Sequence, residues 1–152
     1  MMPRRIINPK HLIFAGLVVL IFEFPLAGCR SLSKSTWKGQ TLSHGQVVNI
    51  ENYLVSGQIT VFDFYSVHCP ACESLSPVLE KLDKDRADIT LVKVDVDRPG
   101  AWAIDWGSPV VRYYEIHSLP HVKIYDQDGH LMAEGDGAIQ KVIDWSQDAA
   151  KP

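Results

Sequence analysis

Two closely spaced cysteines, Cys69 and Cys72, are the residues of this 152-residue chain that most directly indicate chemistry. Pro70 follows the first of them, and proline is well tolerated in the first turn of a helix, where its missing N–H would have no partner. The order therefore predicts a helix over residues 69–85 with Cys69 at its cap position. Unpaired N–H groups and the helix dipole favour a thiolate there, so the pKa of Cys69 should lie below the free value of about 8.5.

The same spacing predicts that the two sulfurs bond reversibly. Residues three apart on a helix share a face, which brings the two α-carbons within the roughly 4.4–6.8 Å that a disulfide requires. We expect Cys69 to be the exposed attacking thiol and Cys72 the more buried resolving thiol. Because so short a loop gains little stability from a disulfide, redox chemistry explains the pair better than a structural role. No cofactor other than this redox-active disulfide is expected.

The third cysteine, Cys29, follows an apolar run over residues 12–24. A run of this length after a basic start is typical of a signal peptide and is short for a membrane span, which needs roughly 20 apolar residues. The order Leu-Ala-Gly-Cys at residues 26–29 resembles the bacterial lipobox, whose cysteine is lipidated and becomes the new N-terminus. The resemblance implies a signal peptide at 1–28 and a lipid anchor on the periplasmic side of a bacterial cell envelope. The alternative is an uncleaved anchor helix with an incidental cysteine.

The elements that position the cysteine pair form a regular alternation. Segment 59–65 is β-branched and aromatic, as is typical of a strand buried on both faces, and with the following helix and a strand at 89–94 it predicts a parallel βαβ unit. Further helices are predicted at 44–54, 108–116 and 138–147, and further strands at 122–125 and 131–134. The prediction is an α/β fold with a central mixed β-sheet flanked by helices on both faces. It spans residues 42–148, after a flexible tether at 29–41 and before a tail at 149–152.

Several landmarks together resemble the thioredoxin family. Asp63, the Cys-Pro-Ala-Cys motif, Pro77 and Pro120 occur in the family's order and spacing, and the resemblance covers roughly residues 42–148. It implies a thioredoxin fold and a thiol–disulfide oxidoreductase that acts on protein substrates with thiols or disulfides. The sequence departs from the family pattern at His68, where the family usually has tryptophan. A protonated His68 would favour the Cys69 thiolate, and a solvated surface residue is an equal alternative.

Asp63 interrupts an apolar strand between two phenylalanines. Desolvation of a buried carboxylate raises its pKa, which makes Asp63 a plausible proton acceptor. The resemblance implies that Asp63 helps to deprotonate Cys72. Lys93, on the neighbouring predicted strand, is expected to pair with Asp63 and to tune its pKa. The alternative is an ion pair at the end of the sheet without a function.

Pro120 precedes a predicted strand, and the resemblance implies that the Leu119–Pro120 bond is cis. Leu119 and Pro120 would then lie beside the disulfide, and the backbone of Leu119 could pair with an extended substrate segment by strand addition. An ordinary trans proline is the alternative. The segment from Ala101 to Pro109 is longer than in a minimal thioredoxin. Trp102, Trp106 and Tyr113 could line a substrate surface, but three core aromatics are favoured.

The expected function is a reductase of extracytoplasmic protein disulfides, supplied with electrons by a membrane donor. The direction stays open, because the dipeptide between the cysteines helps to set the reduction potential. One alternative is copper or zinc binding by the two cysteines with His68 and His121, although there is no second Cys-x-x-Cys motif. A non-catalytic adaptor is another. The formal net charge of -3 gives no basic field that would indicate nucleic acid.

Overall fold

A computed structural model describes residues 39–148 of the chain. The predicted signal peptide, the lipidated Cys29 and the tail at 149–152 lie outside the described residues. Within the described range, no helix is both long and apolar enough to cross a membrane.

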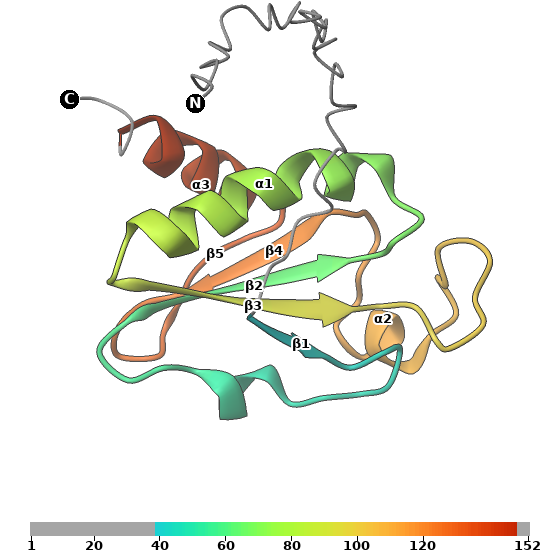
Figure 1. Ribbon diagram of the computed structural model, residues 1–152. Helices are drawn as coiled ribbons and strands as arrows, with labels where there is room; N and C mark the ends of the chain where they lie inside the picture. Colours follow the sequence, from blue (N-terminus) through green and yellow to red (C-terminus); the bar gives the residue numbers. More distant parts are fainter. Residues whose placement is uncertain (1–38, 149–152) are drawn as a thin grey trace, which may run out of the picture. The chain divides into compact units, whose positions relative to one another are not determined.

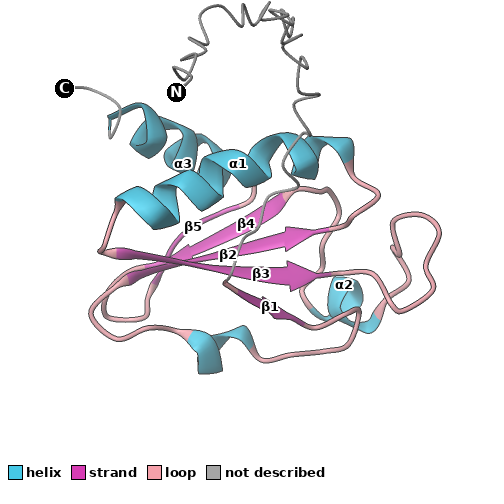
Figure 2. Ribbon diagram, viewed as in Figure 1, coloured by secondary structure: helices cyan, strands magenta, loops and turns pink. Residues whose placement is uncertain are grey.

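The described residues form one five-stranded sheet with helices on both faces (Figures 1 and 2). The spatial order of the strands is β1-β3-β2-β4-β5, in which β1, β3 and β2 are parallel and β4 and β5 are antiparallel to their neighbours. This confirms the predicted mixed sheet. The elements are β1 (Gln40–Leu42), η1 (Ile50–Tyr53), β2 (Ile59–Tyr65), α1 (Pro70–Asp85), β3 (Ile89–Asp95), α2 (Pro109–Tyr113), β4 (His121–Tyr125), β5 (Leu131–Glu134) and α3 (Asp136–Asp148).

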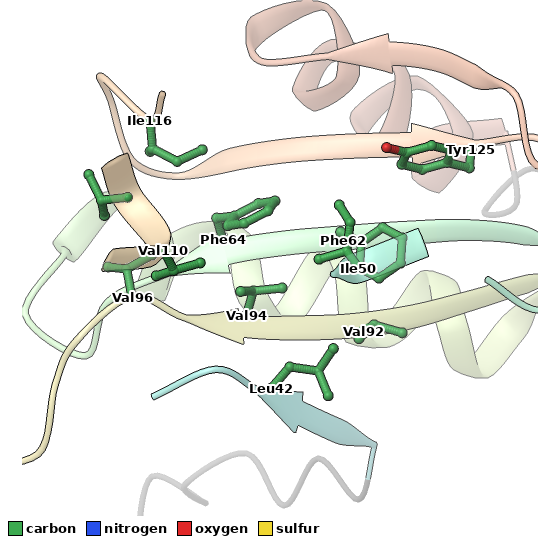
Figure 3. Close-up of a cluster of buried hydrophobic side chains, with 11 residues drawn as sticks. Leu42, Ile50, Phe62, Phe64, Val92, Val94, Val96, Val110, Ile116 and Tyr125 are labelled. Atoms are coloured by element: carbon green, nitrogen blue, oxygen red, sulfur yellow. The ribbon is translucent and has the colours of Figure 1, made fainter. Parts of the chain in front are cut away.

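Each face of the sheet buries its own apolar cluster, because successive side chains of a strand point to opposite faces. Phe62 and Phe64 of β2 pack on one face with Val94 of β3, Ile50 of η1 and Val110 of α2 (Figure 3). The other face is covered by α1 and α3. Its buried residues include Val61, Leu91, Val122 and Ile124 from the sheet, Leu75, Leu79 and Leu82 from α1, and Val142 from α3. The central strand β2 is therefore buried on both sides, as predicted.

The start of the domain differs from the prediction. The helix expected at 44–54 is wrong: Ser43, His44 and Gly45 all have positive φ, which stops a right-handed helix, and only the short η1 forms. Asn49 begins η1 instead, by accepting the N–H of Glu51 on its side chain. Residues 40 and 41, assigned to the tether, belong to β1 and pair with β3.

The helix after the long loop is also shorter than expected. It was predicted over 108–116, and α2 ends at Tyr113 because Glu115 adopts a φ of 53°. Ser108 stands at the cap position, but its hydroxyl makes no capping hydrogen bond. The other helices and strands lie within two residues of their predicted bounds.

The sheet brings three chain segments to one end. β2 runs parallel to β3, so the links that leave β2 and β3 start from the same edge. β4 is antiparallel to β2, with His121 opposite Phe64, so the residues that enter β4 lie at that edge as well. The cysteine pair, the loop after β3 and the Leu119–Pro120 bond therefore share one end of the sheet (Figure 1).

Candidate active site

Cys69 and Cys72 form a disulfide at the start of α1, with their α-carbons 5.3 Å apart. Cys69 has extended backbone angles and is the N-cap, and its sulfur accepts the backbone N–H of Cys72 at 3.1 Å. Pro70 occupies the first turn, as predicted. The position gives the Cys69 sulfur one of the N–H groups that a helix leaves unpaired at its N-terminus.

Both cysteines are buried in this disulfide state, with 5% of Cys69 and 2% of Cys72 exposed. The expectation of an exposed Cys69 is therefore wrong here. The reason is local: the sulfur turns back onto the first turn of α1, where it bonds to Cys72 and accepts that residue's N–H.

A buried polar network holds the link between β2 and α1. The Ser66 hydroxyl donates to Asp97 at 2.7 Å and accepts the N–H of His68 at 3.0 Å. Asp97 lies just after β3, so the network joins the active-site link to the neighbouring loop. His68 itself is exposed, and its Nε2 donates to the carbonyl of Ala101 at 3.0 Å. Ser66 and Asp97 were not among the predicted site residues, although both are polar and each follows one of two adjacent parallel strands, which was the available signal.

Asp63 lies in the middle of β2 with 1% of its surface exposed. Neither of its carboxylate oxygens has a hydrogen-bond partner within the described part of the chain. Burial raises the pKa of Asp63 from 3.8 to about 7; Lys93 acts to lower it and Glu80 to raise it further. Because an unpaired buried carboxylate is costly, this group changes protonation close to neutral pH, as an acid–base residue does.

The predicted pairing of Lys93 with Asp63 needs correction. The two residues are partners in the register of β2 and β3, but the Lys93 ammonium bonds to Glu80 at 2.7 Å and to the Ser76 hydroxyl at 3.0 Å. Glu80 and Ser76 project from α1 and bond to the ammonium. Lys93 therefore acts on Asp63 electrostatically, by lowering the pKa of its carboxyl. Asp63 shares its face of β2 with Val61, which packs in the cluster that α1 and α3 cover, so the carboxyl lies on the α1 side of the sheet.

The Leu119–Pro120 peptide bond is cis, as the family resemblance implied. Both residues are half-buried, and Leu119 packs against the cluster that contains Phe64. No hydrogen bond involves the backbone of Leu119 within residues 39–148. The backbone N–H and carbonyl of Leu119 are thus available for pairing just before β4, at the end of the sheet that carries the disulfide.

The three aromatics predicted for the core, two in the long loop and Tyr113 at the end of α2, are not core residues. Trp102 is 90% exposed, Trp106 46% and Tyr113 60%, so the preference for core aromatics is wrong. The loop extends past the end of the sheet rather than folding over the core (Figure 1).

The histidines of the metal-binding alternative have other partners. His68 bonds to Ala101, and His121 bonds to Glu134 at 3.0 Å. Across residues 39–148, the cluster of metal-ligating groups is Asp126, Asp128 and His130 in the β4–β5 turn, well removed from the cysteines in sequence and at the other end of β4. The structure therefore offers no support for a copper or zinc site at the cysteine pair.

A disulfide-forming cysteine pair at a helix N-terminus, together with a buried carboxyl in the preceding strand of a mixed sheet of this topology, defines a thiol–disulfide oxidoreductase. A model of the thioredoxin family matches residues 43–146, and the chain belongs to that family. A thioredoxin from Mycoplasmoides gallisepticum is 35% identical over 92 residues, which cover 60% of this chain and 83% of that one. A thioredoxin from Chlamydia trachomatis is 37% identical over 99 residues, which cover 63% of this chain and 87% of that one.

Solved structures agree on the fold. Oxidised mitochondrial thioredoxin 3 from Saccharomyces cerevisiae matches with a TM-score of 0.51 and 24% identity, over 72% of this chain and 94% of that one. The family match and the thioredoxin relatives, apart from the solved structures, show a protein-disulfide oxidoreductase.

Proposed function

We propose that the protein reduces disulfide bonds in protein substrates outside the cytoplasm, held at the membrane of a bacterial envelope by lipid on Cys29. The observation that carries the proposal is the position of the Cys69 sulfur at the N-terminus of α1, 3.1 Å from the N–H of Cys72. In the reduced protein this donor would stabilise the Cys69 thiolate, and the thiolate is the form that attacks disulfides.

The reaction begins when the Cys69 thiolate attacks one sulfur of the substrate disulfide. A mixed disulfide forms, and the other substrate sulfur leaves as a thiolate. Cys72 then loses its proton and attacks the Cys69 sulfur, which closes the Cys69–Cys72 disulfide and releases the second substrate sulfur. The two electrons that reduce the substrate come from the enzyme's dithiol. Of the two protons that the substrate gains, one originates on Cys72 and the other comes from solvent.

Asp63 is proposed as the group that takes the proton from Cys72. It lies on the side of the sheet that α1 covers, and its pKa of about 7 leaves a large fraction ionised at neutral pH. Such a carboxylate can accept a proton as the buried thiol attacks, and can then release it toward the departing substrate sulfur. Lys93 acts on this step through Asp63, because its charge lowers the pKa of the carboxyl.

The substrate would lie extended along the entry to β4. The backbone N–H and carbonyl of Leu119 can pair with such a segment as an added strand does, next to Pro120. His68, which precedes Cys69 and is exposed, is proposed to contact the substrate as well.

Return of the oxidised protein to the dithiol requires a membrane dithiol donor, because an oxidising compartment supplies no reducing pool of its own. No cofactor besides the Cys69–Cys72 disulfide takes part.

The reduction potential of the Cys69–Cys72 couple tests the direction of the proposed reaction. A value near the roughly -270 mV of thioredoxin is expected, and a value near the roughly -120 mV of a strong oxidant would contradict a reductase. Reduction of a protein disulfide by the full chain with a dithiol donor should be lost in Cys69→Ser. The anchor is tested separately: incorporation of labelled fatty acid in a bacterial host should occur in the wild type and not in Cys29→Ala.

A further inference from the structure

The loop between β3 and α2, residues 96–108, presents two tryptophans at the end of the sheet that carries the disulfide. Trp102 is 90% exposed and Trp106 46% exposed. Figure 1 shows the loop standing out from the end of the sheet, next to the link that leads from β2 into α1. Val67, in that link, is 73% exposed. Large apolar side chains therefore gather at the end of the sheet where a substrate sulfur must arrive.

The loop is held in place by side-chain bonds at both of its ends. Arg98 and Asp105 form an ion pair across its base, with Nη2 of the arginine 3.0 Å from the carboxylate. The N–H of Asp105 donates to buried Asp97 at 3.0 Å, and His68 of the active-site link donates to the carbonyl of Ala101. The tryptophans are thus presented on an ordered loop, so a partner need not lose binding free energy by ordering it.

A groove of about 510 Å³ lies between the loop and the active-site link. Its lining consists of His68, Trp102, Ala103, Ile104 and Trp106. The volume lies within the roughly 300–1,000 Å³ that ligand sites occupy. Four of the five lining residues carry no charge, their only side-chain polar groups are the indole N–H groups of the two tryptophans, and the ring nitrogen Nε2 of His68 is already bonded to Ala101. The groove therefore suits an apolar side chain rather than a charged one.

We propose that this Trp102–Trp106 groove binds a large apolar side chain of the protein substrate, located a few residues from the cysteine under attack. The inference rests on the proposed function and adds its substrate preference. The groove begins at His68, adjacent in sequence to Cys69, so a polypeptide attached to the sulfur on Cys69 runs past it. An extended segment advances about 3.3 Å per residue, and a leucine or phenylalanine two to four residues from that sulfur reaches a groove that starts one residue from Cys69.

Peptide substrates test the groove. The full-length chain is assayed with peptides that carry the same disulfide and differ only in one residue, Leu or Ser, placed two, three or four positions before or after the cysteine. For the wild type, we expect at least one placement at which Leu raises kcat/KM about tenfold over Ser. The ratio should fall to within about twofold of one in Trp102→Ala and Trp106→Ala.

The matched control is Leu131→Ala. Leu131 is an apolar residue that is 49% exposed, and it pairs with Tyr125 at the far end of β4. This variant should keep the wild-type ratio. Two results would overturn the inference and leave the proposed function standing. One is a wild-type protein that reduces Leu and Ser peptides equally at every placement, and the other is a preference for Leu that survives both tryptophan substitutions. A wild type that reduces no peptide would overturn the proposed function itself.

Discussion

Replacement of Asp63 by asparagine should change how the stability of the protein depends on pH. The carboxyl is buried and its pKa rises from 3.8 to about 7 on folding, so between these pH values the native state binds more protons than the unfolded state. The free energy of unfolding of the wild type must then fall as the pH rises from about 4 to about 7. At 1.36 kcal/mol per unit of pKa, this rise corresponds to a change of about 4 kcal/mol in the free energy of unfolding.

The asparagine variant lacks this titration. Its buried amide costs about 1–3 kcal/mol at every pH, because the site offers no hydrogen-bond partner among the described residues. The variant should therefore be less stable than the wild type at pH 4 and should overtake it at pH 8. The pH-dependent part of the difference should approach about 4 kcal/mol.

Urea unfolding of the oxidised protein at pH 4, 6 and 8 measures this difference. Asp128→Asn, in the exposed β4–β5 turn, is the matched control, and its free energy of unfolding should change with pH as that of the wild type does. Parallel profiles for Asp63→Asn and the wild type would refute the account of Asp63 as a desolvated carboxyl that titrates near neutral pH.

Three further substitutions test the packing and the buried polar groups. Leu79→Ala, at a position of α1 that is 1% exposed, should lower the free energy of unfolding by about 2–5 kcal/mol in a denaturant titration, and a loss under 1 kcal/mol would contradict the packing described. Glu80→Gln should lower the pKa of Asp63 from about 7, because Glu80 raises it and holds Lys93; NMR titration of the Asp63 carboxyl carbon measures this, and an unchanged or higher pKa would exclude the role of Glu80. Ser66→Ala should lower the free energy of unfolding by about 1–3 kcal/mol, because the buried Asp97 loses its hydroxyl donor. An unfolding curve that overlays that of the wild type would show that this hydrogen bond does not contribute to stability.

The core of the fold and the cysteine pair could be predicted because their signals are local. An apolar β-branched run identifies β2, and a cysteine followed by proline identifies the start of α1. Asp63 could be singled out in the same way, because a carboxylate within an apolar run must be buried with it.

The remaining features depend on contacts between distant segments. Gln40–Leu42 has no strand pattern of its own and forms β1 because β3 provides a partner. The partner of Lys93 is decided by the reach of Glu80 from α1, which the sequence of the two strands does not contain. Trp102 is exposed on a loop whose two ends the Arg98–Asp105 ion pair joins. Residue type alone favours burial of a tryptophan.

The ionisation of Cys69 in the reduced full-length chain tests the central claim most directly. Its rate of alkylation is followed as a function of pH, with mass spectrometry of the peptide that contains residues 69–72 to separate Cys69 from Cys72. We predict that Cys69 reacts faster than Cys72 and titrates with a pKa well below about 8.5, because the N-terminus of α1 stabilises the thiolate. A Cys69 that titrates at or above about 8.5, or a Cys72 that reacts first, would contradict the account.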